Sequence, residues 1–354
     1  MPLDPIGRIV QNLVLLERLS NTIGQDSIRL ERALIDQIIH DLERIDPTEP
    51  LRIRYRRGRT KRLIEQIRAR VREFVPTLDK QIRDGLVQIG RDQALWAEDV
   101  LKVTLGAASE NVAHTQITQQ RLRAILNTDP FEGRVLKDHV RRIGSNIADR
   151  VTVQIRIGMA AEESIPDIVR RIRGRRARGG FEGGVLQRST RETEALVRTA
   201  VTHVSNEGMR GTFRENEDIL AGVRFVATLD GRTTPVCMSF DGEVWPLGSP
   251  KIQTPPLHWN CRSILAPEVD WEGLGLPEPP ESLRSARDPV TGKVTKIPGD
   301  ITYEQWLRSQ PASVQAEILG VGKARLFRKG EITLADLVRS DRTVVPLKEL
   351  QGAA

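Results

Sequence analysis

Residues 223–245 read VRFVATLDGRTTPVCMSFDGEVW, and this stretch decides the fold that the sequence predicts. Alternation of apolar and polar residues at 223–229 predicts a β-strand, and Asp230-Gly231 predicts a turn directly after it. Asp241-Gly242 lies between strand-like flanks and predicts a hairpin. The stretch therefore predicts a small antiparallel sheet.

Aromatic residues concentrate around this predicted sheet. Half of those in the chain lie between residues 225 and 306, which indicates a compact module with an aromatic core. Upstream, apolar residues recur at intervals of three and four, as at Leu30, Leu34 and Ile38, and predict long amphipathic helices. The predicted fold class is α+β, with a long, mostly helical N-terminal stem, the aromatic-cored module and a short helical C-terminal tail.

Glycine, proline and capping residues predict where the helices begin and end. The predicted breaks lie near Gly24, at 46–50, at Pro76, at 129–130 and at 179–180. Ser189 or Thr190 is predicted to cap a helix that runs to about Asp218. Thr302 and Gln305 have the spacing of a capping box and predict a helix start in the tail.

These signals divide the chain into five consecutive regions. They are a helical N-terminal region (1–128), a second helical region (129–222), a β-hairpin module with the Cys and His residues (223–267), an acidic, proline-rich linker (268–300) and a helical C-terminal tail (301–354).

Composition indicates a folded chain with room for two or three domains in its 354 residues. No apolar run approaches the roughly 20 residues of a membrane span, and no signal peptide is expected. The net charge of +7 comes mostly from arginine, with 44 Arg against 10 Lys. Only two cysteines occur, so the disulfide framework of a small secreted domain is not expected and the reducing cytosol is the predicted starting compartment.

Three residues that could act together flank the predicted hairpin. Cys237 precedes it, and His258 and Cys261 follow it after the stiffening dipeptide Pro255-Pro256. We expect the hairpin to bring the three side chains together at one end of the module.

This trio has three interpretations. The cysteines could be inert core residues with His258 bonded to a backbone carbonyl, they could form a disulfide, or the three residues could bind zinc. A closed zinc site needs four ligands, so Asp230 or Asp241 would have to be the fourth. Asp230 and Arg232 are otherwise predicted to act locally, Asp230 by accepting turn amides and Arg232 by reaching a carboxylate or carbonyl across the hairpin.

Two runs of basic residues favour an anionic partner, since six or seven cations lie in about ten residues without an acid. The first run comprises Arg52, Arg54, Arg56, Arg57, Arg59, Lys61 and Arg62, and the second comprises Arg170, Arg171, Arg173, Arg175, Arg176 and Arg178. DNA phosphates are the first expected partner and an acidic protein surface the second, while a solvated face is the ordinary alternative. The second run is predicted to be a mobile loop.

Common catalytic motifs are missing from the sequence. No Gly-x-Ser-x-Gly or phosphate-binding Gly-x-x-x-x-Gly-Lys-Ser/Thr occurs, and four of the five histidines lie in predicted helices. A nuclease built on Cys237 and His258 would lack a second histidine and a carboxylate pair. We therefore expect no enzymatic activity.

The motifs together resemble the phage Mu protein F-like head morphogenesis family, the minor head proteins of tailed phages. The resemblance covers about residues 130–267 and rests on Arg198-Thr199 with Asn206, Asp230-x-Arg232-Thr233, Cys237, Asp241-Gly242 and Pro255-Pro256-Leu257-His258-x-x-Cys261-Arg262. Many members of the family carry further cysteines, in place of which this chain has Thr234 and Ser263. The resemblance implies structural roles for Arg198, Asp230, Arg232, Asp241, Gly242 and Arg262.

The resemblance also implies a function. A structural minor capsid protein is expected in several copies per virion, in the capsid interior or at the portal vertex, in contact with the portal protein, the major capsid protein or both. It would contact packaged double-stranded DNA through phosphates, and no membrane. An internal virion protein ejected with the genome is the first alternative, and a metal-dependent nuclease or hydrolase the second.

Overall fold

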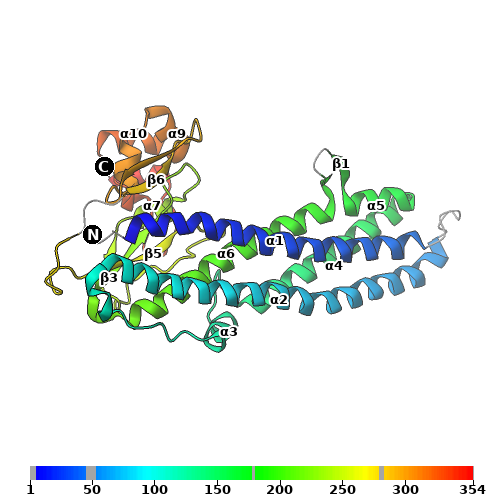
Figure 1. Ribbon diagram of the computed structural model, residues 1–354. Coiled ribbons are helices and arrows are strands. Elements are labelled where there is room, and N and C mark those ends of the chain that lie inside the picture. The colour runs from blue at the N-terminus through cyan, green and yellow to red at the C-terminus, as the bar shows by residue number, and fades with distance from the viewer. Residues whose placement is uncertain (1–4, 45–52, 178–179, 279–282, 354) are drawn as a thin grey trace. The chain divides into compact units, whose positions relative to one another are not determined.

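The structure, a computed structural model, describes residues 5–44, 53–177, 180–278 and 283–353 (Figure 1). Long helices dominate the first 214 residues, and most of the strands follow them, which confirms the predicted α+β class. In the described part of the chain, no helix is both long enough and apolar enough to cross a membrane.

The chain divides into two compact units that are not consecutive in sequence. Unit 1 comprises Met1–Glu17, Gln88–Leu122 and Val201–Ala354, and unit 2 comprises Arg18–Val87 and Arg123–Ala200. The five consecutive regions expected from the sequence differ from this division. The reason is that three long helices each contribute residues to both units, so a linear series of boundaries does not describe the packing.

Helices α1 (Pro5–Glu43) and α2 (Ile53–Leu105) pass through the breaks predicted at Gly24 and Pro76, and those two predictions are wrong. Gly24 lies between the buried side chains of Ile23 and Ile28, whose packing offsets the roughly 1 kcal/mol that a mid-helix glycine costs. Pro76 is exposed, so water can reach the carbonyl group that loses its amide partner there. Segment 45–52, which contains the whole break predicted at 46–50, lies outside the described residues.

Unit 2 is a helical unit with an aliphatic core. Besides parts of α1 and α2 it contains α4 (Leu136–Ala160), α5 (Ile165–Arg173), a hairpin of β1 (Arg175–Ala177) and β2 (Gly180–Glu182), most of α3 (Gln119–Thr128) and the first half of α6 (Gly184–Arg214). Ile35, Ile67, Ile147 and Val151 are fully buried, as expected for apolar residues at helical spacing. The cap predicted at Ser189 or Thr190 is wrong, because α6 begins at Gly184.

Glu31 of α1 is a buried carboxyl group in this core. The Thr193 hydroxyl of α6 donates to its Oε1 atom, while its Oε2 atom is buried without a hydrogen-bond partner among the described residues. Burial raises the pKa of Glu31 to about 7, against the opposing hydrogen bonds from Thr193 and Ser189. An unpartnered oxygen in an apolar core is the natural position for the proton of a neutral carboxyl group.

Unit 1 is built around a three-stranded antiparallel sheet in the order β4-β3-β5. The central strand β3 (Leu220–Val226) pairs with β4 (Val244–Trp245) on one side and with β5 (Ile264–Val269) on the other. The aromatic rings of Phe225, Phe240 and Trp245 pack against one another, as the sequence predicts. The described strand ends at Val226, three residues before its predicted end.

The hairpin predicted at Asp241-Gly242 is wrong in detail. Residues before Asp241 form the short helix α7 (Pro235–Phe240), so this turn leads from a helix into β4 rather than between two strands. Pro235 in the first turn of α7 favours the helix, since its ring is set for helical φ and its missing amide costs nothing there. Gly242 has φ of 91° and lies against Thr302, where a side chain at residue 242 would clash.

The region predicted as an acidic linker contains a second sheet. Strands β6 (Leu283–Arg287) and β7 (Val294–Pro298) form an antiparallel hairpin, so a linker over the whole of 268–300 is wrong. The sequence did not predict β6 and β7 because polar and charged residues interrupt the apolar pattern that indicates a strand. Buried residues of α8 (Tyr303–Arg308), α9 (Ala312–Leu319) and α10 (Val321–Lys329) then form an apolar cluster with Leu229 and Ala286.

The C-terminal tail is helical, as predicted. The capping box predicted at Thr302 is present, with the Thr302 hydroxyl accepting from the Gln305 amide and the Gln305 side chain accepting from the Thr302 amide. The remaining short elements of unit 1 are η1 (Gly106–Asn111), η2 (Glu217–Ile219), η3 (Ala335–Leu337) and α11 (Leu347–Ala353).

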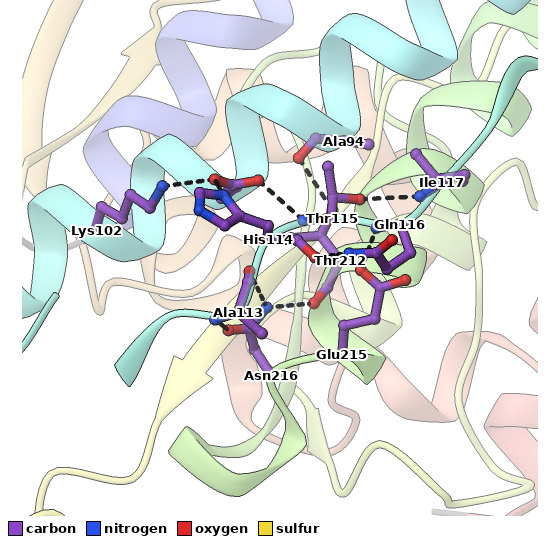
Figure 2. A network of polar contacts seen from close by, with 11 residues as sticks. Ala94, Lys102, Ala113, His114, Thr115, Gln116, Ile117, Thr212, Glu215 and Asn216 are labelled. Atoms are coloured by element: carbon purple, nitrogen blue, oxygen red, sulfur yellow. Dashed lines mark hydrogen bonds and ion pairs between the residues drawn. The ribbon is translucent and has the colours of Figure 1, made fainter. Parts of the chain in front are cut away.

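Polar contacts fasten the extended segment 112–118 of unit 1 to α2 and to the end of α6 (Figure 2). The Asn216 side chain accepts from the Ala113 amide at 2.7 Å and donates to the Ala113 carbonyl. Glu98 accepts from Lys102, His114 and the Thr115 amide. Burial alone would raise the pKa of Glu98, but these hydrogen bonds outweigh it and lower the pKa to about 2.

Candidate functional site

Cys237, His258 and Cys261 converge in unit 1, which confirms the predicted proximity, and we call them the thiol-imidazole cluster. Their ligand atoms all lie within 4.8 Å of one another, and they are the one such group of three or more His, Cys, Asp or Glu residues among those the structure describes. The Cys237 sulfur lies 3.1 Å from His258 Nε2 and 3.7 Å from the Cys261 sulfur. Both cysteines are buried free thiols.

Local structure explains how the cluster forms. Cys237 lies on α7, and His258 and Cys261 lie in the turn before β5, where the Cys261 amide donates to the His258 carbonyl at 3.1 Å. The Cys261 carbonyl accepts from the Thr202 hydroxyl of α6 at 2.7 Å. Asn206, one turn further along α6, accepts from the Leu265 amide, so α6 holds both the turn and β5.

The two thiols of the cluster differ in acidity. The pKa of Cys261 is lowered by a hydrogen bond from the Cys237 thiol, with further help from His258. The pKa of Cys237 is raised by the same contact and by burial. Cys261 is therefore the more acidic thiol, and a thiolate beside an imidazole is a soft donor set suited to a divalent metal such as zinc.

Asp230 does not join the cluster as the fourth ligand that the sequence suggested. Its carboxylate accepts two hydrogen bonds of 2.7 Å from Arg262, and a third, of 3.0 Å, from the Arg232 amide. Burial opposes ionisation of Asp230, but the Arg262 pair outweighs burial and lowers the pKa. The local role predicted for Asp230 is thus confirmed by the Arg232 amide, whereas the Arg232 side chain lies 3.5 Å from the Asp230 carboxylate rather than from an acceptor across the hairpin.

Asp241, the other suggested fourth ligand, is engaged in a buried ion pair with Arg284 of β6. Arg284 also donates to the carbonyl groups of Ala227 and Ile301, while Asp241 accepts from the amides of Ala227 and Tyr303, each at 2.6 Å. The side chains are 0% and 4% exposed for Asp241 and Arg284. Sequence reasoning missed Arg284, because its place in a region predicted as linker offered no signal.

The second basic run is divided between α5 and the β1 hairpin, so the mobile loop predicted for it is wrong over its described residues. Arg170 pairs with Asp167, Arg171 with Glu163 and Arg173 with Asp36, and Arg173 also lies over the Phe181 ring. These intrachain pairs favour the solvated-face interpretation for those three arginines. Arg175 and Arg176 are exposed on β1.

For the remaining predicted site residues, the structure gives their exposure or leaves them undescribed. Lys61 and Arg62 are exposed on α2, and Arg198 is partly buried on α6. Arg52 and Arg178 lie outside the described residues, as do the side chains of Arg54, Arg56, Arg57 and Arg59.

Comparison with known families agrees with the motif analysis. Residues 145–266 match the model of the family described as Phage Mu protein F like protein, which confirms the resemblance over this part of the chain. The matched segment includes the thiol-imidazole cluster, Asp230, Asp241 and Arg262. Searches of curated proteins and of solved structures each found no match.

Proposed function

We propose, from the match of residues 145–266 to the Phage Mu protein F like family, that the chain is a minor head protein that acts in head morphogenesis of a tailed phage. That match is the observation that carries the proposal. The role is structural: the long helices dock on portal or capsid subunits, and unit 1 is a rigid module. The protein resides in the virion, in the capsid interior or at the portal vertex.

The chemistry around the cluster supports a structural rather than a catalytic role. General acid–base catalysis needs a carboxylate or imidazole free to exchange protons with a substrate. The two carboxylates that the sequence placed near the cluster, Asp230 and Asp241, are instead paired with Arg262 and Arg284 inside unit 1. Their hydrogen bonds join the turn before α7 to Arg262, and Asp241 to the residue after β3, to β6 and to the start of α8.

Particle composition tests this function. Purified virions are analysed by quantitative mass spectrometry, alongside ghosts from which the DNA has been released. We expect the protein in mature particles and retained in ghosts, and we expect phage that lack its gene to produce few infectious heads. Loss from ghosts would favour the ejected-protein alternative, whereas absence from virions with normal head yield would contradict the proposal.

DNA contact is the finer part of the proposal, and Arg175 and Arg176 are the residues that carry it. Both are exposed in β1, where their guanidinium groups can pair with backbone phosphates, which carry no sequence information. We expect binding without sequence preference, weakened by salt. Replacing both by Ala should flatten the slope of log affinity against log salt by about 2, since each lost phosphate contact removes about 0.9.

The matched control for that measurement is Arg170→Ala with Arg171→Ala, the same number of arginines from the same segment. Their guanidinium groups already pair with Asp167 and Glu163, so the control should change the slope much less. Fluorescence anisotropy with duplexes of two unrelated sequences gives both slopes. Equal slopes for wild type and the Arg175/Arg176 variant would contradict DNA contact at β1, and loss of particle incorporation with unchanged DNA binding would indicate an acidic protein partner.

A further inference from the structure

The distance between the two sulfurs of the thiol-imidazole cluster matches one bound metal ion better than a disulfide. A disulfide requires the sulfurs at about 2.05 Å, whereas they lie 3.7 Å apart. Two thiolates bound to one tetrahedral zinc ion at about 2.3 Å are about 3.8 Å from each other. The observed spacing is therefore close to the edge of a zinc tetrahedron.

The hydrogen bond on the far side of His258 gives the ring the tautomer that binds metal. Its Nδ1 atom lies 2.9 Å from the Trp259 carbonyl oxygen, which can only accept, so Nδ1 carries the proton. In the neutral ring Nε2 then carries the lone pair that can bind a metal ion, and Nε2 faces the Cys237 sulfur at 3.1 Å. Metal-binding histidines are commonly oriented by such a hydrogen bond to a carbonyl group.

Charge balance explains why a zinc ion in the thiol-imidazole cluster needs neither Asp230 nor Asp241 as a ligand. Two thiolates cancel the charge of Zn²⁺, and a neutral imidazole adds none. Cys237 and Cys261 are 1% and 0% exposed, and a further carboxylate would leave a net negative charge in this buried position. Asp230 and Asp241 are already neutralised by arginines, which is consistent with a neutral fourth ligand.

Thr234, the residue that precedes α7, offers a neutral oxygen for the fourth position. Its hydroxyl oxygen is buried and has no hydrogen-bond partner of ordinary geometry in the described structure. Thr234 is the N-cap residue of α7 and Cys237 lies three positions later in its first turn, a spacing that places the two side chains on the same side of the helix start. A buried hydroxyl without a partner is costly unless something else satisfies it. A metal ion, or a water bound to that ion, would do so.

We propose that Cys237, His258 and Cys261 bind one Zn²⁺ ion, with a neutral oxygen at Thr234 completing the site. The ion ties α7 to the turn before β5, since Cys237 and Cys261 lie 24 positions apart in the sequence. The role of the ion is structural, because it fastens the two ends of this loop within the β4-β3-β5 module.

Metal content of the reduced, full-length chain tests the proposal. We expect one zinc per chain by elemental analysis, protection of both thiols from alkylation, and a fall in melting temperature when a chelator removes the ion. Cys261→Ser and His258→Gln should lose stoichiometric zinc. His114→Gln is the matched control, because His114 belongs to the same unit but is exposed and bonded to Glu98, and it should keep the ion.

A gain of affinity keeps the test decisive if the loss variants fail to fold. Thr234→Cys places a thiol at the proposed fourth position, so it should lower the zinc dissociation constant and strengthen the thiolate-to-cobalt absorption of the Co²⁺-loaded chain. Three results would overturn the proposal. They are absence of stoichiometric zinc or cobalt binding by the reduced wild-type chain, an equal loss in His258→Gln and His114→Gln, and thiols that become titratable only after reduction, which would indicate a disulfide.

Discussion

Replacing Asp241 by alanine is expected to destabilise unit 1 by about 3–5 kcal/mol, because the change leaves Arg284 buried without its counter-ion. The amides of Ala227 and Tyr303 would also lose their acceptor. A buried donor without a partner costs about 1–3 kcal/mol, so low folding yield is the expected first sign. The five tryptophans of the chain all lie in unit 1, and their fluorescence during urea unfolding reports this unit.

The control for Asp241 is another ion pair of the same module. Arg224 and Glu268 pair across β3 and β5 at 2.7 Å, with side chains 25% and 30% exposed. Glu268→Ala should therefore cost about 1 kcal/mol or less. A double variant with Asp241→Leu and Arg284→Met should be more stable than Asp241→Ala, since it removes the unpaired charge. If Asp241→Ala and Glu268→Ala unfold at the same urea concentration, the buried pair does not have the role assigned to it.

Replacing Glu31 by glutamine is expected to stabilise unit 2 at neutral and alkaline pH. The folded-state pKa of Glu31 is raised from 4.5 to about 7, so the protonated form is the one that the core favours. The stability from this group is fully present below about pH 4.5 and is lost as the pH rises through about 7. At 1.36 kcal/mol per pKa unit the loss is about 3 kcal/mol. A glutamine side chain resembles the neutral acid, so the variant should not show this loss.

Hydrogen exchange provides the measurement, because the tryptophans do not report on unit 2. Peptides from α1 and α4 are followed by mass spectrometry at pH 5 and pH 8, with rates corrected for the intrinsic effect of pH. Glu31→Gln and wild type should have similar protection at pH 5, and the variant should have more at pH 8. Glu65→Gln, at an exposed position of α2, is the control and should follow wild type. A variant that is less protected than wild type at pH 8 would show that Glu31 is needed in its charged form.

The sequence was informative wherever one short segment contains all the interacting groups. The Thr302 capping box and the Asp230 turn depend on residues two or three positions apart, and both are present. The convergence of Cys237, His258 and Cys261 could also be predicted, because a reversal of the chain between them was evident even though its form was not. The match to the Phage Mu protein F like family, over residues 145–266, includes this segment.

The tertiary structure alone decided which carboxylates are available as metal ligands and which residues belong to the same unit. Asp241 pairs with Arg284, 43 residues away, and that pair removes Asp241 from the set of metal ligands. Gly24 and Pro76 lie inside continuous helices because burial of the apolar faces around them outweighs their local preference to break a helix. Such outcomes depend on which distant side chains come into contact and exclude water. Local pattern contains no information about those contacts, so the sequence by itself determined the Asp230 turn, the Thr302 cap and the proximity of the cluster residues, and packing determined the rest.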